Sequence, residues 1–329
     1  MTSSETIPDL VSFGSESDIY TIEIRPTTKC NYNCYYCEDL HNNKNPNLQL
    51  DADSVVALIQ SAKAHLHKPV KIYLYGGEPT MYSGLLDLIN ILSNACDDND
   101  LIEIQSNFSR PQKWFENICE QIENKRRVRF SGSYHNTQTS ITKFLRVCMY
   151  LKHTWFLNMV TFMYNRRKSV IKDFELARRL LGEKHCELSP LISSTIDQNP
   201  ALNNNTHTEI DYIYEHEDCE KFYKHSFMFD NMIPYETTEG EKHTSRAMMW
   251  KLRNYNFKGM KCSIKKDKIY IDWDGSAYKC INDLLGGQSS QFNVNDSPDY
   301  DEYFSTVTCF ECPHTRCFFD MEYEKHPNK

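Results

Sequence analysis

The stretch Ile19–Cys37, IYTIEIRPTTKCNYNCYYC, decides how the rest of the chain is interpreted. Its first part, Ile19–Ile24, is rich in β-branched and aromatic residues and is strand-like. Three cysteines follow directly, Cys30, Cys34 and Cys37, with C-x3-C-x2-C spacing. A strand that leads into three closely spaced thiols predicts a metal site in the loop after that strand.

The same kind of strand recurs along the chain and alternates with helical patterns. Strands are expected at Ile19–Ile24, Lys71–Tyr75, Leu101–Gln105, Arg127–Ser131, Thr154–Phe162 and Cys186–Ile192. Helices are expected between them, at Asp53–His67, Gly84–Ala95, Pro111–Asn124, Ile141–Leu151 and Val170–Leu181. This alternation predicts an α/β fold with a parallel sheet covered by helices. Six strands are fewer than the eight of a closed barrel, so residues 19–192 should form a partial, TIM-like (β/α)6 barrel.

The remaining segments differ in character. Residues 1–18 are expected to be an N-terminal extension, and residues 193–255 a bridging segment with some helix. Residues 256–329 are predicted to form a small cysteine-rich domain that contains a β-hairpin. Its strands would be Lys268–Trp273 and Ser276–Cys280, joined by the turn Asp274-Gly275.

Composition narrows the classes of function. The chain has 329 residues, of which 40% are hydrophobic, and a formal net charge of -8. Such a chain can bury a substantial core, and binding to duplex nucleic acid is not expected without a basic footprint. The sequence shows neither an apolar run of membrane-spanning length nor a secretory signal at its start. A cytoplasmic location is therefore predicted.

The chain has thirteen cysteines, which is many for a cytosolic protein. Because disulfides are rare in that compartment, clustered cysteines there indicate metal binding or catalysis. One group is Cys30, Cys34 and Cys37. The second group comprises Cys262, Cys280, Cys309, Cys312 and Cys317. The other five are interpreted as small buried apolar residues: Cys96, Cys119, Cys148, Cys186 and Cys219.

Three thiolates in one short loop can hold three corners of a four-iron cluster. Such clusters usually take four cysteines, so one iron would keep an open position for another ligand. The alternative is a structural zinc site, for which His41 or a distant residue would have to supply the fourth ligand.

On these residues the chain resembles the radical SAM superfamily, whose enzymes use S-adenosylmethionine (SAM). The cysteine loop matches the family motif, with Tyr36 as its aromatic residue. Gly76, Gly77, Glu78 and Pro79 stand at the end of the second strand, where the family has its GGEP motif. The resemblance implies that SAM fills the open iron position, that the glycines let the backbone approach its amino group, and that Glu78 accepts a hydrogen bond from that group.

Polar residues near the ends of later strands extend this resemblance. Ser106 and Asn107 are similar to the family's ribose-binding segment. Ser131, Ser133 and Asn165 are expected at the same catalytic face, with ordinary turn chemistry as the alternative. His135, after the fourth strand, is a candidate acid or base in the catalytic site, although a surface histidine is the commoner case.

The second cysteine group resembles the C-terminal extension of the SPASM and twitch subfamilies, which carries auxiliary iron–sulfur clusters. The element Gly275-x4-Cys280 matches that pattern. A full SPASM pattern has seven cysteines, so five indicate one auxiliary cluster. The expected ligands are Cys262, Cys280, Cys309 and Cys312, with Cys317 in reserve. A structural zinc ribbon is the alternative.

The resemblance implies an enzyme that reductively cleaves SAM to a 5′-deoxyadenosyl radical and abstracts hydrogen from a substrate. A peptide substrate is favoured, because the similar subfamilies are rich in peptide maturases. A small-molecule or nucleotide substrate is the alternative, and a non-catalytic, metal-stabilised interaction module is a further one. An electron donor such as a flavodoxin or ferredoxin is expected as a partner.

Overall fold

The computed structural model describes residues 10–13, 17–34, 37, 50–164, 168–190, 233–237, 242–245, 257–285, 287–306, 309–314 and 325–326. No helix within these ranges combines the length and apolar character needed to cross a membrane.

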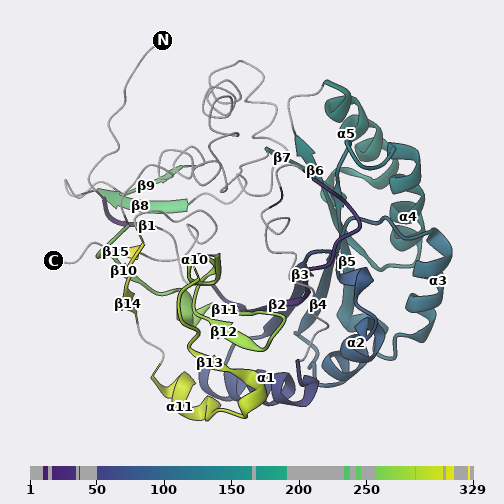
Figure 1. Cartoon of the computed structure of the whole chain (residues 1–329). Helices are drawn as coiled ribbons and strands as arrows, with labels where there is room; N and C mark the ends of the chain where they lie inside the picture. Colours follow the sequence, from purple (N-terminus) through teal and green to yellow (C-terminus); the bar gives the residue numbers. More distant parts are fainter. Residues whose placement is uncertain are drawn as a thin grey trace.

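A curved sheet of parallel strands forms the centre of the fold (Figure 1). Its first six parallel strands are β2 (Tyr20–Thr27), β3 (Val70–Gly76), β4 (Leu101–Ser106), β5 (Val128–Tyr134), β6 (Leu157–Tyr164) and β7 (Cys186–Pro190). They lie in chain order, and Ile22, Ile72, Ile102 and Val128 stand in register across the first four. The predicted α/β partial barrel of six strands is therefore confirmed.

Five helices cover the outer side of this sheet (Figure 1). They are α1 (Ala52–Leu66), α2 (Leu85–Asn94), α3 (Gln112–Gln121), α4 (Ile141–His153) and α5 (Lys168–Leu181). Alternate apolar residues of each strand, such as Ile22 and Ile24, are fully buried against apolar helix residues such as Leu58. Because strand side chains alternate between faces, the intervening polar residues point to the inner side of the barrel.

Most boundaries lie within a few residues of those predicted, and the differences have local causes. The strand predicted from Thr154 begins at Leu157, because Thr154 ends α4 and Trp155 follows with a φ of 64°. The strand predicted at Arg127–Ser131 starts after a short 3-10 helix and continues to Tyr134. Asp51 is the N-cap of α1, and its side chain accepts a hydrogen bond from the Asp53 amide.

The predicted C-terminal hairpin is present, and it extends the barrel sheet. Strand β11 (Lys268–Ile271) pairs in parallel with β2, so that Tyr270 lies opposite Glu23. Strand β12 (Ser276–Tyr278) returns antiparallel after Gly275, whose φ is +86°, and β13 (Phe292–Asn293) follows at the edge. The order is therefore β13-β12-β11-β2-β3-β4-β5-β6-β7. The domain boundary proposed at residue 256 stays a prediction.

A second sheet joins segments from both ends of the chain. It has the order β14-β10-β15-β1-β8-β9. Its strands are β1 (Leu10–Phe13), β8 (Ile233–Thr237), β9 (Lys242–Ser245), β10 (Lys261–Cys262), β14 (Phe310–Glu311) and β15 (Lys325–His326). The described parts of the predicted bridging segment are thus two strands; the helix expected there falls outside the described residues.

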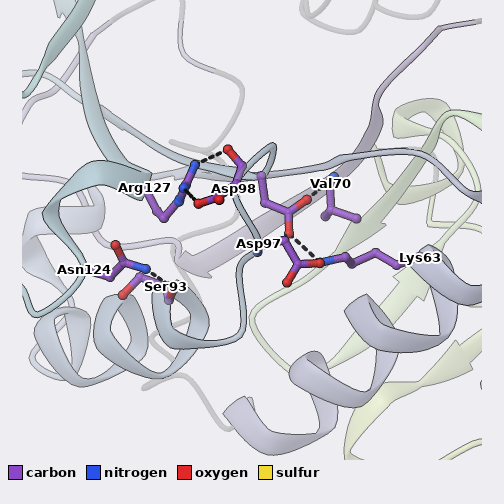
Figure 2. A network of polar contacts seen from close by, with 8 residues as sticks. Lys63, Val70, Ser93, Asp97, Asp98, Asn124 and Arg127 are labelled. Atoms are coloured by element: carbon purple, nitrogen blue, oxygen red, sulfur yellow. Dashed lines mark hydrogen bonds and ion pairs between the residues drawn. The ribbon is translucent and has the colours of Figure 1, made fainter.

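A polar network fixes the amino ends of three strands, opposite the end that carries the predicted site (Figure 2). The Asp100 carboxylate accepts hydrogen bonds from the amides of Val70 and Asp97, both at 2.7 Å, and pairs with Lys63 at 2.6 Å. On the surface nearby, Arg127 pairs with Asp98. Contacts at this end of a parallel barrel position the strands and leave the opposite edge for chemistry.

Candidate functional site

The carboxyl ends of four neighbouring strands carry most of the predicted site residues. The cysteine loop follows β2, the Gly-Gly-Glu-Pro segment begins at the last residue of β3, Asn107 follows β4 and His135 follows β5. These strands are adjacent and parallel. Their ends therefore meet at one edge of the sheet.

The three thiols of the first cysteine group differ in exposure within one loop. Cys30 is exposed, Cys34 is buried and Cys37 is intermediate. The Cys37 amide donates to the Cys34 carbonyl at 3.0 Å, and the Tyr32 amide donates to the Cys30 sulfur at 3.4 Å. The loop thus contains a turn from Cys34 to Cys37, and Cys30 lies just before this turn. Tyr36, the aromatic residue of the motif, lies outside the described residues.

The glycines after β3 let the next turn lie directly against this loop. A side-chain carbon on Gly77 would lie 2.4 Å from the carbonyl oxygen of Lys29, and Gly76 has a φ of +119°. The amide of Gly77 donates to Thr27 at 3.0 Å, and that of Glu78 donates to Lys29 at 2.7 Å. Only glycine permits this approach. The described contact is with the chain before Cys30; the expected approach to the SAM amino group stays a prediction.

The Glu78 carboxylate joins the ends of β3 and β4. One oxygen, Oε1, accepts from the Thr80 amide, the Thr80 hydroxyl and the Ser106 hydroxyl at 2.6 to 3.1 Å. The other, Oε2, accepts from the Asn107 amide at 2.7 Å. Burial raises the pKa of the Glu78 carboxyl, although these four donors favour its charged form. The sequence predicts Glu78 as an acceptor for SAM; the structure shows an acceptor for the protein's own donors.

Asn107 connects the end of β4 to the cysteine loop. Its amide nitrogen Nδ2 donates to Asn31 Oδ1 at 3.1 Å and lies 3.8 Å from the Cys30 sulfur. Its Oδ1 accepts from the Ser109 amide at 2.9 Å, and Phe108 between them has a φ of 50°. Such a conformation is uncommon for a bulky residue and is held by the surrounding contacts.

His135 and Gln138 bring the end of β5 to the same loop. The His135 ring meets the Tyr32 ring edge to face, with 6.0 Å between centroids. Gln138 brackets Asn33: its Oε1 accepts from the Asn33 amide at 3.3 Å, and its Nε2 donates to the Asn33 carbonyl at 3.2 Å. Burial lowers the pKa of His135 to about 4. At pH 7 the imidazole is therefore neutral, which suits a proton acceptor or a hydrogen-bonding group. To act as an acid, His135 would first have to take up a proton.

The two predicted serines lie inside the barrel, within β5. Ser133 Oγ accepts from Gln105 Nε2 at 2.6 Å, and Gln105 in turn accepts from the Tyr73 hydroxyl at 3.1 Å. Ser131 was expected at the end of its strand, but it lies within the strand because β5 continues to Tyr134. Asn165 lies outside the described residues.

Ser131 belongs to a charged cluster deeper in the barrel. Its hydroxyl donates to Glu103, which also pairs with Lys71 Nζ at 2.6 Å. Burial opposes ionisation of Glu103, but Lys71 and the hydrogen bonds outweigh burial and lower the pKa of that carboxyl. The inner side of the barrel is therefore polar, as a cavity for a polar substrate would be.

Most of the described C-terminal cysteines lie in one region. Cys262 and Cys280 belong to a single buried apolar cluster. Cys312 is buried as well, and its amide donates to the Met260 carbonyl at 2.8 Å, which joins its segment to the one that carries Cys262. Cys309 is exposed. Cys317 lies outside the described residues.

Three further residues near these sites carry no sequence signal that would have revealed them. Gln138 holds the cysteine loop across 105 residues of sequence. Arg25 and Asp272 form a buried ion pair with contacts of 2.7 and 2.8 Å, which joins the end of β2 to the hairpin. Pairings over such separations depend on the tertiary fold and leave no periodicity in the sequence.

With this geometry in place, comparison with known families gives a direct match. Residues 24–155 match the model of the Radical SAM superfamily. The match covers the cysteine loop, the Gly-Gly-Glu-Pro turn, Asn107 and His135. No curated protein matches the sequence.

Solved structures agree with this fold. The chain is similar to SuiB of Streptococcus suis bound to S-adenosylmethionine, with a TM-score of 0.54, 16% identity, and coverage of 87% of this chain and 66% of SuiB. SuiB bound to its precursor peptide SuiA gives a TM-score of 0.53, 15% identity and the same coverage. Native anSMEcpe with bound AdoMet gives 0.54 and 15% identity over 88% of this chain and 81% of that one. The chain thus spans just under two thirds of SuiB, and at these identities the likeness concerns the fold alone.

Proposed function

We propose that the chain is a radical SAM enzyme in which Cys30, Cys34 and Cys37 hold a four-iron cluster with one open iron. The observation that supports this most directly is the contact among three strand ends. The cysteine loop, the Gly-Gly-Glu-Pro turn and Asn107 are hydrogen-bonded to one another. Three thiols in one loop fit the three-cysteine donor set of such a cluster.

The protein's own residues would bind and orient the group and its ligand. Cys30, Cys34 and Cys37 would hold the cluster, which would supply the electron for reductive cleavage of SAM and so the radical chemistry for hydrogen abstraction from the substrate. The amides of Gly77 and Glu78 bond the Gly-Gly-Glu-Pro turn to the chain just before Cys30. Asn107 bonds to Asn31, at the start of the cysteine loop. Among the predicted SAM-contacting residues, Ser106 and Asn107 are oriented by Glu78. Direct contact with SAM stays a prediction for the four residues Gly76–Pro79 and for Tyr36, Ser131, Ser133 and Asn165.

For the substrate we propose a peptide, held at the carboxyl ends of the strands. SuiB, whose fold is similar, has been solved with a precursor peptide. The polar inner side of the barrel, with Tyr73, Gln105 and Ser133 in one hydrogen-bonded row, offers donors and acceptors to a peptide backbone. The same polarity also suits a small molecule or nucleotide, which is the alternative. His135, beside the cysteine loop, is the proposed acid–base residue.

We further propose that the C-terminal cysteines bind metal. Cys262, Cys280 and Cys312 lie on buried, mutually connected segments of this region, as metal ligands would. An auxiliary iron–sulfur cluster at these residues and Cys309 stays a prediction, as do a SPASM or twitch domain, an electron donor and a cytoplasmic location.

The decisive test of the first site compares two cysteine variants. Cys34→Ala should abolish reductive SAM cleavage, because two thiols do not retain the cluster. Cys96→Ala should retain it, because Cys96 lies away from the loop and burial raises the pKa of its thiol to about 12. The measurement is 5′-deoxyadenosine formed by anaerobic protein with a chemical reductant, alongside iron per chain. Undiminished cleavage by Cys34→Ala would exclude the proposed three-cysteine cluster as the site of cleavage. Absence of both SAM cleavage and iron in the wild type would leave a metal-stabilised interaction module as the remaining hypothesis.

A further inference from the structure

A group of three different metal-binding side chains lies at the end of the C-terminal hairpin. It consists of Cys280, Asp283 and His314, and one ligand atom from each lies within 4.8 Å of the others. Cys280 and Asp283 are 5% and 3% exposed, and His314 is partly buried. Asp283 and His314 did not stand out in the sequence, because neither belongs to a cysteine motif.

The three side chains come from two segments of the chain: Cys280 and Asp283 lie in one turn, and His314 lies 31 residues after Asp283. Cys280 follows β12, and Asp283 lies in the short helix α10 (Ile281–Leu285), whose turn is closed by the Asp283 amide on the Cys280 carbonyl at 3.2 Å. His314 belongs to the segment after β14, which is fixed by the Cys312 amide on Met260. His314 Nε2 meets Asp283 Oδ1 at 2.7 Å, and Lys279 Nζ lies 3.7 Å from Asp283 Oδ2. The Asp283 and His314 side chains are therefore in direct contact.

The donor types identify the class of ion. A thiolate, an imidazole and a carboxylate together form the ligand chemistry of zinc, with bonds of about 2.0–2.3 Å. In a tetrahedral site, two ligand atoms at these bond lengths lie about 3.3–3.8 Å apart. The ligand atoms of Cys280, Asp283 and His314 all lie within 4.8 Å of one another, so small side-chain movements would bring them onto one ion. An iron–sulfur cluster binds each ligand at a different iron and takes mainly cysteines, so its ligand atoms are spread farther.

We propose that Cys280, Asp283 and His314 bind one zinc ion through the Cys280 sulfur, an Asp283 oxygen and a His314 ring nitrogen. The proposal rests on the metal-binding role proposed above for the C-terminal region, and it replaces the predicted cluster at Cys280. The fourth position of the tetrahedral site is left to water or a further side chain. The ion joins β12, α10 and the segment after β14, and so anchors the hairpin that extends the barrel sheet.

The test measures zinc and iron together in the anaerobically purified full chain. One zinc and about four irons per chain are expected in the wild type, the irons at the first cysteine group. His314→Ala should weaken zinc binding more than about a hundredfold, because loss of an outer partner of a ligand already costs about ten- to a hundredfold, and should leave the four irons in place. His314→Cys should retain zinc, which shows that a His314→Ala loss reflects a missing ligand and not a failure to fold.

Two cysteine variants separate this site from the other proposals. Cys309→Ala should keep the zinc, because Cys309 is exposed and outside the proposed set, whereas an all-cysteine cluster would lose iron. Cys34→Ala should lose the four irons and keep the zinc, which separates this site from radical SAM activity. Substitution with Co²⁺ should give the intense visible bands of a tetrahedral thiolate site. About eight irons without zinc, unchanged in His314→Ala and reduced in Cys309→Ala, would overturn the zinc site in favour of an auxiliary cluster. Absence of both zinc and extra iron would overturn the metal-binding role as well.

Discussion

The carboxylate of Glu78 accepts hydrogen bonds from four donors and is 1% exposed. Two of these donors, the Ser106 hydroxyl and the Asn107 amide, belong to the end of β4, and Asn107 in turn reaches Asn31 and Cys30. The position of the cysteine loop relative to the barrel therefore depends on a side chain that touches neither cysteine nor solvent. A buried acceptor of this kind is costly to remove, because its donors remain unsatisfied.

We expect Glu78→Ala to lower the free energy of unfolding by roughly 2–4 kcal/mol, since it leaves several buried donors without an acceptor. SAM affinity should fall with it, because Asn107 loses its orientation. Thr80→Val is the matched control: it removes one hydroxyl donor, retains the Thr80 amide bond, and should cost about 1 kcal/mol. Thermal unfolding and calorimetric SAM binding, on protein with full iron, check both values. Weakened SAM binding by Glu78→Gln at unchanged stability would contradict this and indicate direct contact between the carboxylate and SAM.

At the scale of the elements, the two ends of the parallel strands have different tasks. The carboxyl ends carry the cysteine loop and its supports. The amino ends of β3 and β4 are fixed by Asp100, which contacts Val70, Asp97 and Lys63. Figure 2 shows this region, and the cysteine loop follows the opposite, carboxyl end of β2. Stability and site geometry should therefore respond separately to substitutions at the two ends.

The variant Asp100→Ala tests this separation. It removes the acceptor of two backbone amides and the partner of Lys63, so we expect a loss of about 2–4 kcal/mol in the free energy of unfolding. Asp98→Ala is the surface control, because the Asp98 side chain is 98% exposed although it pairs with Arg127; it should cost less than about 1 kcal/mol. Urea unfolding gives both values. The folded fraction of each variant should cleave SAM at the wild-type rate, and a specific loss of cleavage in Asp100→Ala would show that the two ends are coupled.

At the scale of the whole molecule, local patterns predicted the barrel but not the contacts that close it. The strand–helix alternation over residues 19–192 was predictable, because period and turn residues are properties of neighbouring positions. The cysteine loop and the Gly-Gly-Glu-Pro turn were recognisable for the same reason. That β11 adds to the β2 edge was not predictable, and neither was the contact between Gln138 and Asn33, since both join residues distant in sequence. Thr154 and Trp155 show where local patterns fail. Their residue types favour a strand, but in the structure they form the end of α4 and the turn that follows it.

The ion pair between Arg25 and Asp272 is a buried charged contact that joins the hairpin to the carboxyl-terminal half of β2. It spans 247 residues of sequence, and the two side chains are 7% and 10% exposed. The Arg25 side chain also packs on Gly76, where an added Cβ would lie 2.3 Å from Arg25 Cγ. Movement of the hairpin would therefore reach the Gly-Gly-Glu-Pro turn through a single arginine.

We expect Asp272→Asn to lower the free energy of unfolding by about 3–5 kcal/mol, because it leaves the Arg25 guanidinium buried beside a neutral group. The amide oxygen of asparagine can still accept from the Trp273 amide, as Asp272 Oδ1 does at 2.8 Å, so the loss of stability reports the loss of the charge alone.

The double variant Arg25→Met, Asp272→Leu should recover most of the stability, since apolar replacement of a buried ion pair is often neutral. Glu175→Gln, which breaks a half-exposed pair with Arg178, should cost less than about 1 kcal/mol. Thermal unfolding measures stability, and limited proteolysis reports whether residues 268–280 detach first. If Asp272→Asn unfolds like Glu175→Gln and the hairpin stays resistant, the strand pairing of β11 with β2 holds the hairpin without the ion pair, and Arg25 serves the glycine turn alone.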